Sequence, residues 1–247
     1  MSGRFLGKLR GKLDRFDHPG CHRDHLWDIR QTSGLRLFLH ALNDVPEIQQ
    51  VCTNVVDEFE KIQDQLNALK WGTLQADFND ANIIFNDLGD QVVGIIDFGD
   101  IVYSNRINDL AIAMAYMTLR PPVGFTTVQT AATFLQGYCQ TMDIAQEELN
   151  VLRKLVACRL ACSVTLGAFS SMQDKSDNEY LQLHAAPGRK ALLEFWNIDE
   201  QEVHLLFKKA ADEGLKCRLR ETKVRQIIGG TVGFVLISSF LKGLLGY

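Results

Sequence analysis

Apolar residues at helical spacing cover most of the chain. The clearest case lies between residues 47 and 70, where an apolar residue recurs every three or four positions: Ile48, Val51, Val55, Phe59, Ile62, Leu66 and Leu69. Similar patterns occupy residues 4–16, 106–119, 126–141, 145–171, 187–196 and 200–213. The chain is therefore predicted to be mainly helical.

One short region breaks the helical pattern. Residues 83–86 and 91–96 are rich in β-branched side chains, and a turn signal, Asn86-Asp87-Leu88-Gly89-Asp90, separates them. Two short strands around such a turn predict a β-hairpin. Polar residues gather in the loops on either side of this hairpin, so the chemistry is expected there.

Composition narrows the class of protein. The chain has 247 residues, of which 46% are hydrophobic and 23% are charged, as in a globular protein of one large or two small domains. A net charge of −4 argues against binding nucleic acid by neutralising its phosphates. The six cysteines follow no tight framework and the N-terminus lacks the apolar stretch of a signal peptide, so we expect reduced thiols in a cytoplasmic protein.

The loops around the hairpin carry three residues at a spacing that suits phosphoryl transfer. Asp77 is followed five positions later by Asn82, and after the hairpin comes Asp97-Phe98-Gly99. A tight loop with this offset lets Asp77 face a substrate hydroxyl while Asn82 turns toward the phosphates, and the hairpin returns Asp97 to the side of Asn82. A carboxylate and an amide oxygen suit Mg²⁺. The alternative is two polar turns whose Asp and Asn serve turn geometry alone.

Three segments resemble the catalytic core of the aminoglycoside phosphotransferase and choline kinase superfamily. Residues 75–84 (QADFNDANII) resemble the His-Gly-Asp-x4-Asn-Ile-Leu loop of these enzymes. Residues 94–100 (GIIDFGD) resemble the strand end that binds their metal. Asn108-Asp109-Leu110-Ala111 resembles the Asp-Leu-Ala that opens their next helix, where the aspartate braces the catalytic loop.

The residues after the catalytic and metal positions are similar to those of the hydroxylysine kinase branch of this superfamily. They are Phe78-Asn79-Asp80, Phe98-Gly99-Asp100 and residues 113–117 (AMAYM). His18-Pro19 and Trp27-Asp28 also resemble that branch. The resemblance covers roughly residues 4–215.

The resemblance implies a protein-kinase-like fold of the aminoglycoside phosphotransferase type, and this chain is similar to its C-terminal lobe. That lobe is mainly α, with a small β-hairpin carrying the catalytic and metal loops. The expected organisation is a lobe over residues 1–215, helical over 1–70, catalytic over 71–119 and helical over 120–215, followed by a basic stretch and an apolar tail over 216–247.

The implied activity is transfer of the γ-phosphate of GTP or ATP, with Mg²⁺, to a hydroxyl of a small amine substrate, foremost 5-hydroxy-L-lysine. Asp77 is then the catalytic base, and Asn82 and Asp97 are the metal ligands. Three further residues support them: Gln75, Asp100 and Asp109. Asp80 is the acidic residue we expect to meet an ammonium group of the substrate.

Two departures from the family pattern leave alternatives open. Gln75 stands where the family has His and Ala76 where it has Gly, changes expected to weaken the loop more than abolish it, with Ala76 sterically tolerable. Only 76 residues precede Asp77, and they are predicted to be helical, without the glycine-rich loop and strand lysine of a nucleotide lobe. The chain is thus either the C-terminal lobe of an active kinase or an inactive pseudokinase or scaffold. A kinase for choline, homoserine or an aminoglycoside is a further alternative.

The C-terminal tail, residues 227–247, has a composition unlike the rest. It carries no charge from Ile227 to Leu241, and four basic residues precede it between positions 218 and 225. Its length just reaches that of a membrane span, about 20 residues, although five glycines dilute its hydrophobicity. We expect a mainly soluble, cytoplasmic protein, with a tail-anchored membrane protein as the alternative.

Overall fold

The computed structural model describes the backbone of residues 1–173 and 179–245 and the side chains of residues 1–173 and 186–224. The first part is helical, as predicted: α1 (Ser2–Leu13), three 3-10 helices η1 (Pro19–Cys21), η2 (Ile29–Leu37) and η3 (Leu39–Leu42), α2 (Pro46–Lys61) and α3 (Gln63–Asn67). Asp28 begins η2 by accepting a hydrogen bond from the backbone N–H of Arg30.

Four short strands follow, in two antiparallel pairs. β2 (Ile83–Phe85) pairs with β3 (Val92–Ile95), which confirms the predicted hairpin, with an irregularity in register between Ile84 and Phe85. β1 (Trp71–Leu74) pairs with β4 (Val102–Asn105), a pairing that the sequence did not predict. Each of these strands has only four residues, too few for alternation to be recognised, and their pairing joins segments about thirty residues apart.

The remaining helices build the core. They are α4 (Ile107–Met117), α5 (Thr127–Cys139), α6 (Gln146–Gln173), α7 (Glu179–Asn197) and α8 (Glu200–Leu245). α4 is buried along all of its first nine residues, and it packs against α5 and α6. α5 in turn contacts α1 and α8, and α6 contacts α2 and α7. The core therefore lies directly behind the loops that carry the predicted chemistry.

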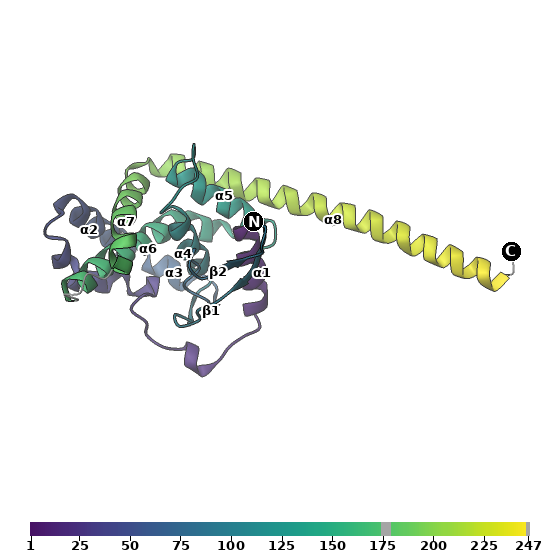
Figure 1. Ribbon diagram of the computed structural model, residues 1–247, viewed down its shortest axis with the longest axis horizontal. Coiled ribbons are helices and arrows are strands. Elements are labelled where there is room, and N and C mark those ends of the chain that lie inside the picture. The colour runs from purple at the N-terminus through teal and green to yellow at the C-terminus, as the bar shows by residue number, and fades with distance from the viewer. Residues whose placement is uncertain (174–178, 246–247) are drawn as a thin grey trace.

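Three predicted helices differ from the structure. The single helix predicted over residues 47–70 divides at Ile62 into α2 and α3. α7 begins before Pro187 rather than at it, and α8 continues from the predicted end near residue 213 to Leu245, extending away from the helical body (Figure 1). The side chains of the tail, residues 227–247, lie outside the described residues.

Within the described part of the chain, one helix is long and apolar enough to cross a membrane, Gln146–Gln173. It is α6, and 61% of its most apolar window is buried inside the molecule, as in the core helix of a soluble protein.

Candidate functional site

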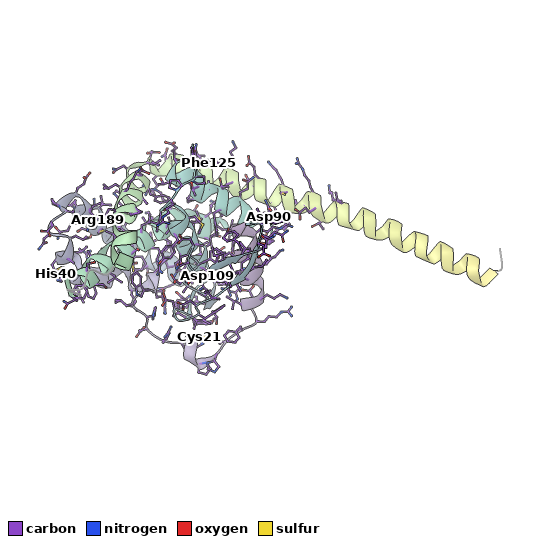
Figure 2. The ribbon with its side chains drawn as sticks, viewed as in Figure 1. Cys21, His40, Asp90, Asp109, Phe125 and Arg189 are labelled. Atoms are coloured by element: carbon purple, nitrogen blue, oxygen red, sulfur yellow. The ribbon has the colours of Figure 1, made fainter. Side chains whose placement is uncertain are left out.

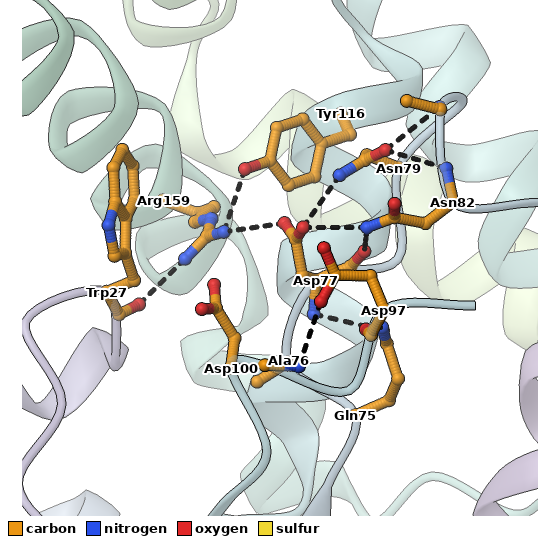
Figure 3. A network of polar contacts seen from close by, with 12 residues as sticks. Trp27, Gln75, Ala76, Asp77, Asn79, Asn82, Asp97, Asp100, Tyr116 and Arg159 are labelled. Atoms are coloured by element: carbon orange, nitrogen blue, oxygen red, sulfur yellow. Dashed lines mark hydrogen bonds and ion pairs between the residues drawn. The ribbon is translucent and has the colours of Figure 1, made fainter. Parts of the chain in front are cut away.

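The loop between β1 and β2 holds the side chain of Asp77 at both carboxylate oxygens. Oδ2 accepts hydrogen bonds from the side-chain amides of Asn79 (2.9 Å) and Asn82 (2.8 Å). Oδ1 lies 3.1 Å from Nη2 of Arg159 on α6 (Figure 3). The Asp77 side chain keeps 19% of its surface exposed, so a substrate hydroxyl can still approach it.

The hairpin brings the second loop alongside the first. The backbone N–H of Ile96 donates to the carbonyl of Asn82 at 2.9 Å, immediately before Asp97. Asp97 itself has a φ of +56°, a left-handed conformation that costs a non-glycine residue of the order of 1 kcal/mol or more. In this conformation its Oδ1 accepts from the N–H of Gly99 at 2.9 Å. The structure thus places Asp97 beside Asn82, as the sequence predicted.

Gln75 joins the two loops from inside the molecule. Its side chain is fully buried, its amide donates to the carbonyl of Asp97 at 2.8 Å, and its oxygen accepts from the N–H of Asp77 at 3.0 Å. A glutamine amide has both N–H donors and a carbonyl acceptor, and here one N–H and the oxygen are both used. Gln75, which stands where the family pattern has histidine, therefore connects the two loops.

Ala76 adopts a φ of +66°, which favours glycine. Ala76 stands where the family has Gly, and its Cβ makes this positive φ less favourable than it is for glycine. The residue is also buried, with 3% of its surface exposed.

The carboxylate of Asp109 binds the backbone at Ala76. It lies in the first turn of α4, inside the helical body (Figure 2), and accepts from the N–H groups of Ala76 (2.9 Å) and Gln75 (3.3 Å). Burial raises the pKa of Asp109, while its hydrogen bond from Ala76 and the charge of Arg10 oppose that shift. Arg10 of α1 is 3.7 Å from the Asp109 carboxylate and donates to the carbonyl of Thr73 at 2.6 Å.

Asp100 lies close enough to Asp77 and Asp97 for their negative charges to act on it. Its Oδ1 is 3.5 Å from Nε2 of His25. Burial, and then the negative charge of Asp77, raise the pKa of Asp100, while His25 and Arg159 act in the opposite direction. An excess of negative charge therefore gathers where a cationic ligand is predicted to bind.

Asp80 has a different setting from the other predicted site residues. Its side chain is 58% exposed, and its carboxylate lies 3.9 Å from Arg120, just beyond α4. Its assignment to a substrate ammonium group stays a prediction.

The sequence analysis did not identify two buried arginines of the site, Arg159 and Arg10, which lie far from Asp77 along the chain. Arg159 is 1% exposed and also contacts Trp27 and Tyr116, and Arg10 is equally buried. A signal for Arg159 existed, because it is a lone charge within the apolar run of residues 155–166, and arginine is rarely buried without a partner. Arg10 had no such signal in the basic helix α1.

The donor set of the two loops fits Mg²⁺ only in company with phosphate and water. Asn82 uses its amide N–H groups on Asp77, which leaves its side-chain oxygen for a cation, and Asp97 adds a carboxylate. Among the residues that the structure describes, no group of three or more His, Cys, Asp or Glu side chains could hold a metal ion. Mg²⁺ is commonly held by one or two protein oxygens together with substrate phosphates, so two ligands are sufficient.

Comparison with known proteins identifies the class to which this geometry belongs. A family model described as "Phosphotransferase enzyme family" matches residues 2–149, more than half of the chain. The chain belongs to this family, and the superfamily expected from the sequence is confirmed.

The most informative individual relatives carry the name hydroxylysine kinase. The protein from Bos taurus is 27% identical over 221 residues, which are 85% of this chain and 58% of the relative. The protein from Xenopus laevis is 26% identical over 225 residues, 84% of this chain and 59% of the relative. The chain therefore spans about three fifths of the length of the curated relatives that it matches.

A solved structure, amicoumacin kinase in complex with AMP-PNP, Ca²⁺ and Ami, is similar to this chain with a TM-score of 0.54 and 18% identity. The similarity covers 82% of this chain and 61% of that one. The likeness confirms the predicted kinase-like fold, mostly helical with small antiparallel sheets.

Proposed function

We propose that this protein takes part in transferring the γ-phosphate of a nucleoside triphosphate to a hydroxyl of a small amine, foremost 5-hydroxy-L-lysine. The observation that carries the proposal is the Asp77 carboxylate, held at both oxygens yet still accessible, beside the loop that presents Asp97. The relatives named hydroxylysine kinase support the choice of substrate. We also propose a cytoplasmic location, in keeping with six unpaired cysteines.

In this proposal the residues divide the work as follows. Asp77 accepts a hydrogen bond from the acceptor hydroxyl, orients it toward the phosphorus and takes its proton as the new bond forms. Asn82 and Asp97 would hold Mg²⁺, whose charge offsets that of the phosphate oxygens. Gln75, Asp109 and Asp100 keep the two loops together and the site negative. The donor is GTP or ATP, and the complex of amicoumacin kinase with a nucleotide analogue and a divalent ion is in keeping with that choice.

One observation favours a second proposal, a non-catalytic kinase-like module. In the described residues ahead of Trp71 the chain forms only helices and turns, without strands that could cover a nucleotide. Phosphoryl transfer depends mainly on positioning and electrostatic stabilisation of the phosphates, so a non-catalytic module of this kind would bind Mg-nucleotide only weakly.

Nucleotide binding and turnover together separate the two proposals. The purified chain is titrated with Mg-ATP and Mg-GTP by calorimetry and then assayed for nucleoside diphosphate release with 5-hydroxylysine, choline, homoserine or an aminoglycoside. The kinase proposal expects release that depends on 5-hydroxylysine and disappears in Asp77→Asn. Absence of nucleotide binding, and of release with every acceptor, would favour the non-catalytic module. Release with another acceptor only would show that 5-hydroxylysine is not the substrate.

A further inference from the structure

Arg159 connects the core to the catalytic loop through one buried guanidinium group. Its Nη2 donates to Oδ1 of Asp77 (3.1 Å) and to the hydroxyl of Tyr116 (2.7 Å), and its Nη1 donates to the carbonyl of Trp27 (2.7 Å). The guanidinium carbon lies 5.2 Å from the ring centre of Trp27 and 5.1 Å from that of Tyr116 (Figure 3). Three separate segments therefore fix the position and the plane of this group.

Fold stability alone does not account for a charge at this position. A buried ion pair is often no more stabilising than well-packed apolar residues of similar size, because both charges lose their water. The neighbours of Arg159 on α6 are apolar and buried: Leu155, Val156, Ala161, Cys162 and Leu166. An apolar side chain would suit this stretch, so the contact with Asp77 is the distinctive property of Arg159.

Arg153, six residues earlier on the same helix, offers a matched comparison. Its guanidinium also faces a tryptophan, 5.3 Å from the ring of Trp196. Its hydrogen bonds within the described part of the chain go to backbone carbonyls, those of Trp196 (3.0 Å) and Ile198 (3.1 Å), at the end of α7. Arg153 thus joins two helices, whereas Arg159 ends on the carboxylate proposed to be the catalytic base.

The three donors around Asp77 determine how its carboxylate is turned. Asn79 and Asn82 occupy Oδ2 and Arg159 occupies Oδ1, so rotation of the carboxylate would lengthen at least one hydrogen bond. We propose that Arg159 is a positioning residue of the phosphotransfer site, which sets the orientation of Asp77 toward the acceptor hydroxyl while Trp27 and Tyr116 hold Arg159 in place. The inference rests on the proposed function and assigns a role to a residue outside both catalytic loops.

Kinetics provide the first test. Arg159→Met should lower kcat by about 10²-fold with little change in the KM for nucleotide, because small displacements of a reacting group have effects of that size. Arg159→Lys keeps the charge but offers no planar fork, so it should recover only part of the loss. Arg153→Met and Arg153→Lys should leave kcat within a factor of about three of the unmutated protein. A folded Arg159→Met protein that also stays within that range overturns the inference.

A second measurement does not depend on turnover. The side-chain amide signals of Asn79 and Asn82, assigned by substitution, report the hydrogen bonds to Asp77 in ¹H–¹⁵N spectra. They should shift in Arg159→Met and remain in place in Arg153→Met, whether or not the chain transfers phosphate, so failure of the proposed function is distinguishable from failure of this inference. If Arg159→Met does not fold, Arg159→Lys and Tyr116→Phe carry the same comparison. Unchanged amide signals in these variants overturn it.

Discussion

Asp77 is the residue on which the proposed chemistry depends. In Asp77→Asn the side chain keeps its size but loses the charge that pairs with Arg159 and the ability to accept a proton. We expect kcat to fall by about 10²–10⁴-fold, the usual contribution of a positioned base, with little change in KM. Steady-state kinetics with the acceptor and nucleotide varied in turn measure both quantities.

Asp80, three residues along the same loop, provides the control. Its carboxylate is exposed and lies 3.9 Å from Arg120, and it takes no part in the hydrogen bonds that hold Asp77, so Asp80→Asn should leave kcat nearly unchanged. If Asp80 meets the substrate ammonium group, the KM for the amine rises in that variant. Equal losses of kcat in Asp77→Asn and Asp80→Asn would remove Asp77 from its special role.

We expect Asp100 to make the stability of the folded protein depend on pH. Its pKa in the folded state is raised above the ordinary value of 3.8, first by burial and then by Asp77. Between the two values the folded state binds more protons than the unfolded state, so the free energy of unfolding decreases as the pH rises through that window. Asp100→Asn should reduce this decrease. Urea unfolding at a series of pH values measures it, and a slope that is the same in both proteins would contradict the assignment.

At the scale of elements, the helices behind the site hold the catalytic loop from several sides. α4 presents Asp109 to the backbone of Gln75 and Ala76, and α1 presents Arg10 to Thr73 and to Asp109. α6 supplies Arg159 from a third direction. The loop therefore keeps its strained conformation at Ala76 because neighbouring elements satisfy its polar groups.

Arg10 tests this arrangement. Arg10→Met should lower the free energy of unfolding by about 3 kcal/mol, because it removes a buried partner of Asp109 and of the Thr73 carbonyl. Arg4→Met, on the same helix, removes a partly exposed pair with Glu221 and should cost less than about 1 kcal/mol. Denaturant unfolding compares the two, and equal losses would show that the buried contacts of Arg10 contribute no more than a surface pair.

At the scale of the whole molecule, the question to test is whether the tail, residues 227–247, anchors the protein in a membrane. Both the chain of 247 residues and one that ends at Arg225 are expected in the soluble fraction, because five glycines and two serines reduce the hydrophobicity of residues 227–247. Cell fractionation with carbonate extraction decides between the two locations. If the chain of 247 residues pellets with membranes and resists extraction while the shorter chain stays soluble, the tail is a membrane anchor.

The amino-acid sequence by itself determined the features that depend on neighbours along the chain. Helical periodicity located most of the helices, although α7 and α8 exceed their predicted bounds, and the turn at residues 86–90 located the hairpin. The spacing of Asp77, Asn82 and Asp97 brings these residues together through a single short hairpin, so it could be interpreted without a fold.

Only the tertiary structure decided which distant side chains complete the site. Arg159 is 82 positions from Asp77, and Arg10 is 63 positions from Thr73. Such contacts leave no periodic signal, because they arise from the packing of α1, α4 and α6 around the loop. The positive φ of Ala76 and Asp97 is equally a property of the fold, since alanine and aspartate do not adopt it by preference and neighbouring elements impose it.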